Sequence, residues 1–124
     1  MLSLTGKTAV VTGSGSGQAS SGLFTRQGAA VHILELNAAA GQQMAAEIQQ
    51  AGRLLAHVRA VDVSQQAAVA AFQATGRDVL VNNADIAHVG NVKNTSEADF
   101  DRVHQVNVRG AYNRLFTTMP LMRV

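Results

Sequence analysis

Glycine and serine alternate between Thr12 and Gly17, directly after the apolar, β-branched run 9–11. A loop of this kind between a strand and a helix brings backbone N–H groups close to a pyrophosphate, because glycine turns tightly and carries no side chain. The same composition also suits a flexible turn without a ligand. The residues that the loop would offer to a dinucleotide are Gly13, Ser14, Gly15, Ser16 and Gly17.

An acidic residue ends the next apolar run of the chain. Glu35 stands about 20 residues after Gly13, which is the spacing of a carboxylate that accepts a hydrogen bond from a ribose hydroxyl. A carboxylate there repels a 2′-phosphate, so the pattern favours NAD over NADP. The alternative is an exposed surface glutamate.

Polar residues also follow the third and fourth apolar runs. Asp62 would accept a hydrogen bond from an adenine amino group while Val63 covers the ring, or Asp62 simply turns the chain. Asn82 and Asn83 precede Ala84, and their amides offer donors and acceptors beside a nucleotide. The alternative for the two asparagines is an Asx turn.

The apolar runs alternate with helix-forming segments. We expect strands at 8–12, 30–36, 54–63 and 78–82 and helices at 19–27, 38–51, 64–73 and 96–118. This alternation predicts an α/β, Rossmann-like doubly wound parallel sheet of four strands in order 3-2-1-4, with helices on both faces. Ligands of such sheets bind beyond the carboxyl ends of the strands, where the polar residues above are placed.

Four residues are expected to begin or end helices. Asn37, Ser64 and Ser96 are predicted N-caps, and Ser96 forms a capping-box-like pair with Asp99. Gly28 is a predicted left-handed C-cap.

Composition limits the class of protein. The chain has 124 residues, a hydrophobic fraction of 47%, no cysteine and a net charge of +2, which fits one domain over residues 1–124 without disulfides. The basic residues are scattered, so we expect no nucleic-acid partner. No apolar run is long enough to cross a membrane, so we expect no membrane partner. The absence of cysteine and of a secretory apolar segment after Met1 fits a cytoplasmic location. The four histidines show no metal-ligand spacing.

Several strings together resemble the short-chain dehydrogenase/reductase family, specifically its N-terminal, cofactor-binding half. They occur in family order and cover essentially the whole chain: GKTAVVTG (6–13), GAAVHILELN (28–37), VDVS (61–64), VLVNNADIA (79–87) and ADFDRVHQVNVRGAY (98–112). The resemblance implies NAD(P)-dependent oxidation and reduction of alcohols and carbonyls.

The resemblance also implies roles for individual residues. Gly13 and Gly17 would be loop glycines, Glu35 the acid that selects NAD, and Asp62 the adenine contact. Asn82 and Ala84 would lie along the cofactor. Asn107 would be the helix asparagine that supports the proton relay of the family, and the last helix would pack against a second subunit.

The chain departs from the family pattern near the cofactor. Counted back from Phe24 and Gly28, the loop is two residues shorter than the family loop TGxxxGxG, so Gly17 matches its last glycine. Asp85 stands where the family has glycine. Both changes predict weak dinucleotide binding. The shorter loop displaces donors from the phosphates, and hydrogen bonds tolerate little displacement. Asp85 adds a carboxylate side chain near the expected path of the ribose.

The catalytic pair of the family, a tyrosine and a lysine in Tyr-x-x-x-Lys, is missing from these residues. Tyr112 is followed four positions later by Phe116. We therefore expect a shortened dehydrogenase that is inactive alone. The alternatives are an inactive nucleotide-binding or subunit-association module and a fold without a ligand. We also expect a homo-oligomer, formed through the last helix or the exposed sheet edge 79–81.

Overall fold

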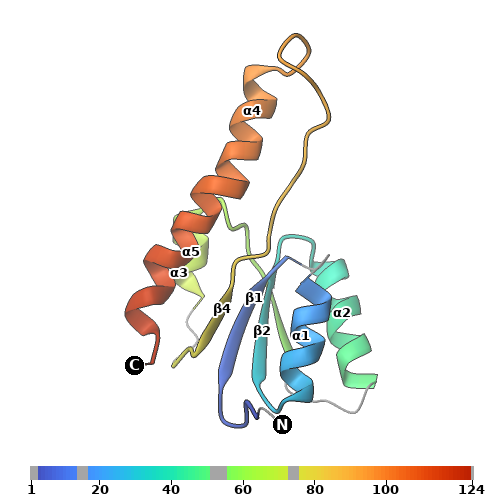
Figure 1. The fold of residues 1–124 in the computed structure, drawn as a ribbon, viewed down its shortest axis with the longest axis vertical. Coiled ribbons are helices and arrows are strands. Elements are labelled where there is room, and N and C mark those ends of the chain that lie inside the picture. Colours follow the sequence, from blue (N-terminus) through green and yellow to red (C-terminus); the bar gives the residue numbers. More distant parts are fainter. Residues whose placement is uncertain (1–2, 14–16, 51–55, 73–75, 124) are drawn as a thin grey trace.

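A computed structural model describes residues 3–13, 17–50, 56–72 and 76–123. Its strands form one parallel sheet in the order β3-β2-β1-β4, as predicted (Figure 1). The strands are β1 (Thr8–Thr12), β2 (Ala30–Glu35), β3 (Ala56–Ala60) and β4 (Val79–Val81).

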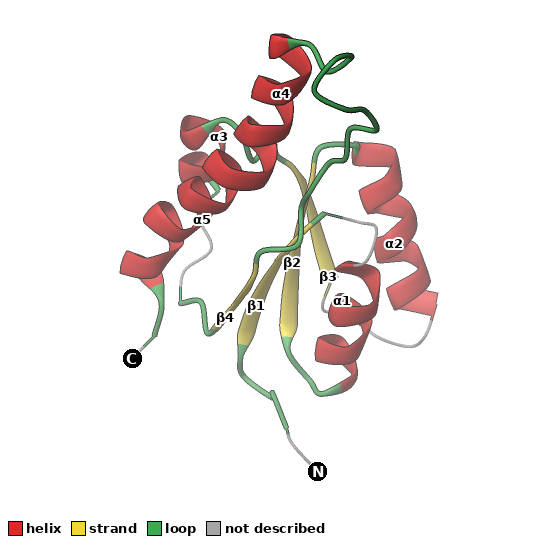
Figure 2. Cartoon of the chain, turned by 45° about the horizontal axis from the view of Figure 1, so that its top comes forward, coloured by secondary structure: helices red, strands yellow, loops and turns green. Residues whose placement is uncertain are grey.

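Helices cover both faces of the sheet. Figure 2 shows α1 and α2 on one face, and α3, α4 and α5 on the other side. A π-helical segment, Gln105–Arg109, joins α4 to α5, and a 3-10 turn, Met119–Leu121, follows α5. The helices are α1 (Gly17–Arg26), α2 (Ala38–Gln50), α3 (Gln66–Ala71), α4 (Glu97–His104) and α5 (Gly110–Thr118). None of the helices in the described ranges has the length and apolar character needed to span a membrane.

The central strand β1 is buried on both faces, which explains its unbroken apolar sequence. One core cluster lies on the side of α1 and α2 and includes Val11, Ile33, Met44 and Ile48. The other lies on the side of α3 and comprises Val10, Leu34, Val61, Val69 and Phe72. Alternate residues of β1 and β2 therefore fill opposite cores.

Three of the predicted helix caps are confirmed. Gly28 follows α1 with a φ of +91°, the left-handed conformation that favours glycine. Asn37 Oδ1 accepts from Ala40 N at 3.1 Å at the start of α2. Ser96 Oγ accepts from Asp99 N at 3.0 Å and caps α4.

The prediction that Ser64 caps α3 is wrong. The hydroxyl of Ser64 donates to Asp62 Oδ1 at 2.7 Å, and the same oxygen accepts from Ser64 N at 2.9 Å. This Asx turn uses the serine before the helix begins, so the N-cap falls on Gln65, whose side chain makes no cap hydrogen bond. The third strand also ends earlier than predicted, at Ala60.

The last segment of the chain lies beside the start of β4. Arg77 N donates to Leu121 O at 3.3 Å, and Arg123 N donates to Arg77 O at 2.8 Å. Arg123 Nη1 also bonds Asp78 Oδ2 at 3.0 Å. Among the described strands, β4 itself pairs only with β1, so the predicted sheet edge at 79–81 is present.

Candidate functional site

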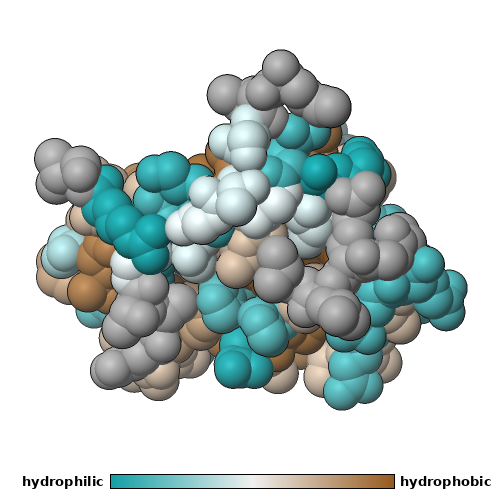
Figure 3. Space-filling model, turned by 90° about the horizontal axis from the view of Figure 1, so that it is seen from below, coloured by the Kyte–Doolittle hydropathy of each residue, from teal (hydrophilic) through white to brown (hydrophobic). Residues whose placement is uncertain are grey.

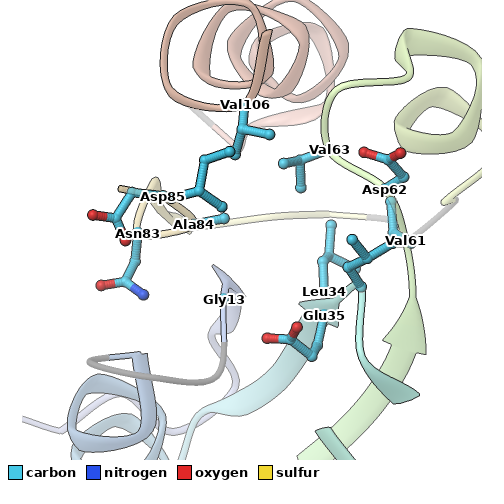
Figure 4. Close-up of a pocket in the computed structure, with 12 residues that line it drawn as sticks. Gly13, Leu34, Glu35, Val61, Asp62, Val63, Asn83, Ala84, Asp85 and Val106 are labelled. Carbon is cyan, nitrogen blue, oxygen red and sulfur yellow. The ribbon is translucent and has the colours of Figure 1, made fainter. Parts of the chain in front are cut away.

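A hollow of about 300 Å³ lies beyond the carboxyl ends of the strands, where Rossmann-like sheets bind ligands. Figure 4 shows that its wall combines the ends of β1 and β2, the segment after β3 and the segment after β4. The predicted site residues that line it are Gly13, Glu35, Asp62, Val63 and Ala84. The remaining lining residues are Leu34, Leu36, Val61, Asn83, Asp85, Ile86 and Val106.

Gly13 lines the hollow in a conformation that favours glycine. Its φ is +81°, and a Cβ there would lie 2.9 Å from the Ala84 Cα. Its N–H donates to Leu34 O at 2.9 Å, which fixes the turn against β2. The absence of a side chain therefore lets β1 and the segment after β4 meet at one point.

Thr12, which we did not predict as a site residue, holds the two segments together. Its hydroxyl donates to Val81 O at 3.3 Å and accepts from Asn83 N and Ala84 N, both at 3.1 Å. Asn83 Nδ2 donates to Thr12 O at 3.0 Å. A buried threonine at the end of an otherwise apolar strand was the available signal, because a buried hydroxyl needs partners.

Glu35, at the end of β2, and Asp62, after the end of β3, both line the hollow. Glu35 is half-buried, and its Oε1 accepts from Asn37 N at 2.9 Å, which orients the carboxylate at the end of β2. Asp62 forms the Asx turn with Ser64 and also lines the hollow. The turn interpretation of Asp62 is thus confirmed, and its contact with an adenine stays a prediction.

The lining of the hollow carries negative charge. Glu35, Asp62 and Asp85 are carboxylates, and none of the lining residues that the structure describes is lysine, arginine or histidine. Figure 4 shows Asp85 and Asp62 on opposite sides of the hollow. These residues offer no cation to a 2′-phosphate.

Asn107 fixes one wall of the hollow. Its Oδ1 accepts from Ile86 N and its Nδ2 donates to Ile86 O, both at 2.9 Å. Asn107 lies in the π-helical segment beside Val106, which faces the hollow together with Ile86. In this structure Asn107 therefore positions the segment after β4, and its part in a proton relay stays a prediction.

The remaining predicted residues lie apart from the hollow or outside the described part of the chain. The side-chain oxygen of Asn82 accepts from Arg114 Nε, and Asn82 does not line the hollow. Ser14, Gly15 and Ser16 fall outside the described residues, and Gly17 begins α1. The first turn of α1 contains no acidic residue of its own, and the side chain of Gln18 in that turn donates to the Glu47 carboxylate of α2.

Within the described ranges, no three histidine or acidic side chains gather closely enough to hold a metal ion.

Comparison with known proteins identifies the family. The family model of the short chain dehydrogenases matches residues 7–123. The chain belongs to the short-chain dehydrogenase family. Oxidoreductase UcpA of Salmonella typhimurium is 38% identical over 130 residues, which cover 98% of this chain and 49% of that protein. Sorbitol dehydrogenase of Cereibacter sphaeroides is 34% identical, over 88% of this chain and 44% of that protein.

Solved structures of the family agree with this assignment. A 3-ketoacyl-(acyl-carrier-protein) reductase of Brucella melitensis complexed with NADH matches with a TM-score of 0.85 and 33% identity, over 96% of this chain and 51% of that one. An NAD+-bound xylitol dehydrogenase matches with a TM-score of 0.85 and 27% identity, over 95% of this chain and 48% of that one. The chain thus spans about half the length of these relatives.

Proposed function

We propose that this chain forms the NAD-binding half of a dehydrogenase that interconverts alcohols and carbonyls. The observation that carries the proposal is the convergence of Gly13, Glu35 and Asp62 on one hollow at the carboxyl edge of the sheet. When bound, a nicotinamide dinucleotide supplies the hydride chemistry. The residues described here would hold its adenosine end.

The side chains at the hollow support a preference for NAD(H) over NADP(H). The Glu35 carboxylate, oriented by the Asn37 N–H, would accept from a ribose hydroxyl. A 2′-phosphate would meet this carboxylate with no cationic residue in the described lining to offset it.

Two features support weak binding. Asp85 stands at a position where the family has glycine, and it adds a carboxylate to the lining beside Ala84. The shortened loop 13–17 would displace the N-terminus of α1 from a bound pyrophosphate, and backbone donors act only within about 2.7–3.2 Å.

The test is a fluorescence titration of the purified chain with NADH and with NADPH. We expect detectable binding of NADH and weaker binding of NADPH. Glu35→Ala should reduce this discrimination, because it removes the charge repulsion. Asp101→Ala removes an exposed carboxylate from α4 and serves as the matched control. Tight binding of NADPH by the unmutated chain would overturn the preference.

The second candidate function is an inactive nucleotide-binding or subunit-association module. It is supported by the large exposed apolar side chains of α5, including Tyr112 and Phe116.

These 124 residues contain no Tyr-x-x-x-Lys pair, so we expect no dehydrogenase turnover from them alone. Turnover of simple alcohols or ketones that Asn107→Ala abolishes would contradict this. A coding sequence that continues in frame into a Tyr-x-x-x-Lys motif would favour the dehydrogenase.

A further inference from the structure

A second hollow, of about 400 Å³, lies on the face of the sheet that α3 covers. It opens between β2, β3 and α3, and its walls include His32, Arg59, Ala68, Ala71 and Phe72. The helix α3 is six residues long and, among the described residues, contributes only Ala68 and Ala71 to this wall. Val61 lines both this hollow and the one at the carboxyl edge, whereas the five residues named above line this one alone.

Basic side chains of two neighbouring strands meet at this hollow. His32 of β2 is paired in register with His57 of β3, and the two rings are stacked with centroids 5.3 Å apart. Arg59 follows two residues later on β3, so its side chain shares the face of His57. The described lining contains no acidic residue.

His32 carries a polar atom that the surrounding chain leaves without a partner. Its Nδ1 is buried and, within the described residues, makes no hydrogen bond. Because solvent does not reach this atom, the ring of His32 is held by its contacts with the rings of His57 and Phe72 rather than by a hydrogen bond of Nδ1. Arg59 Nη1 donates to Val58 O at 3.2 Å, and its guanidinium has further N–H donors.

Basic groups surround His32. Burial lowers the pKa of His32 below its ordinary value, and the positive charges of His57, Arg59 and Arg77 lower it further.

The opposite wall is apolar and firmly held. The ring of Phe72 stands edge-on to His32, with centroids 5.4 Å apart. The buried Arg77 fixes Phe72, because its guanidinium lies 5.0 Å from the ring centroid and its Nη2 donates to Phe72 O at 2.6 Å. Ala68 and Ala71 add methyl groups beside the ring.

We propose that this hollow binds a small organic carboxylate with a flat apolar body. The carboxylate bonds Arg59 and lies beside the imidazole of His32, and the apolar body packs on Phe72 and the two alanines. Arginine suits this role because its planar fork matches a carboxylate.

The probe is benzoate, and its binding is measured by NMR of the histidine rings in the full chain without any dinucleotide. We expect benzoate to bind and to raise the pKa of His32, because a neighbouring negative charge favours the protonated imidazole. Acetate lacks the apolar body and benzamide lacks the charge, so each should bind at least about tenfold more weakly. Equal binding of benzamide and benzoate would overturn the proposal.

Variants locate the site. Arg59→Gln, on the exposed edge strand, should weaken benzoate binding about tenfold and leave the circular dichroism spectrum unchanged. Ala68→Leu should block binding by filling the hollow. Arg102→Gln removes the same charge from an exposed position on α4 and should have no effect. Unchanged affinity in Arg59→Gln, or benzoate binding without any shift of the His32 ring signals, would refute the proposal. Neither result depends on NADH binding.

Discussion

At the scale of single residues, the geometry of the dinucleotide hollow depends most on Gly13. Gly13→Ala should lower the free energy of unfolding by about 1–3 kcal/mol, because alanine is strained at a φ of +81° and its Cβ would press on the Ala84 Cα. NADH binding should be lost with it. Chemical denaturation and NADH titration measure both effects.

The matched control for this change is Gly22→Ala in α1. A Cβ at Gly22 would meet only Arg26 Nη1, at an ordinary 3.6 Å, and alanine favours a helix by about 0.5–1 kcal/mol. Gly22→Ala should therefore be neutral or stabilising. If Gly13→Ala were also neutral or stabilising, the close approach of β1 to Ala84 would not be needed for the stability of the fold.

His32 makes the stability of the fold depend on pH. Its pKa lies below the ordinary 6.5, so the unfolded chain binds more protons than the folded chain when the pH falls through 6.5. We expect the free energy of unfolding to fall over that range and His32→Phe to reduce the slope. The measurement is urea denaturation at several pH values.

His104→Gln, at an exposed position, should keep the slope and serves as the control. The stability that the ionised Asp78 contributes is lost in a separate, lower pH range. The pKa of Asp78 is held below its ordinary 3.8 chiefly by the Thr8 N–H, and then by Lys7 and Arg123. An unchanged slope near pH 6.5 in His32→Phe would exclude His32 as the cause.

At the scale of elements, the sequence predicted the order and type of strands and helices because each apolar run is local. The bounds of β1 agree with the prediction, since both faces of Thr8–Thr12 are covered and its pattern is continuous. Bounds that depend on side-chain competition were not predictable. The Ser64 hydroxyl bonds Asp62 in an Asx turn instead of capping α3. The sequence pattern does not show which of these two hydrogen bonds forms.

The site was predictable where one residue type suits one position and not where distant segments meet. Gly13 and Glu35 follow from turn geometry and spacing. Asn107 pairs with Ile86 and so joins the helical segment Gln105–Arg109 to the segment after β4. The hydrophobic pattern of the sequence does not predict that Gln105–Arg109 is π-helical. The bond of Asn82 to the buried Arg114 is likewise a tertiary contact.

The loop before α1 is an element whose length can be tested directly. Insertion of Ile-Gly after Gly17 restores the family length and should strengthen NADH binding, because the N-terminus of α1 would return to the pyrophosphate position. NADH titration of the variant measures this. The same insertion after Asn91, in an exposed segment, is the control and should have no effect. Unchanged NADH affinity in the Gly17 variant would argue against a deletion in the loop.

At the scale of the whole molecule, apolar surface concentrates along the last helix. Tyr112 and Phe116 stack on each other one turn apart, and they are 56% and 58% exposed. Val108, Leu115 and Met119 are exposed on the same helical segments. Figure 3 shows apolar surface on the side where Figure 1 places α5. A surface of this kind favours association.

We therefore predict that the chain forms a dimer or larger oligomer through this face of α5. The sheet edge at β4 is the less favourable route, because residues 121–123 already lie beside Arg77 at its start. Sedimentation should show association, and the double change Tyr112→Glu and Phe116→Glu should shift it to monomer by placing charges in the apolar contact. Gln105→Glu, an exposed change on the preceding π-helical segment, should leave the association unchanged. A cooperatively folded monomer at high micromolar concentration of the unmutated chain would show that this face needs no partner.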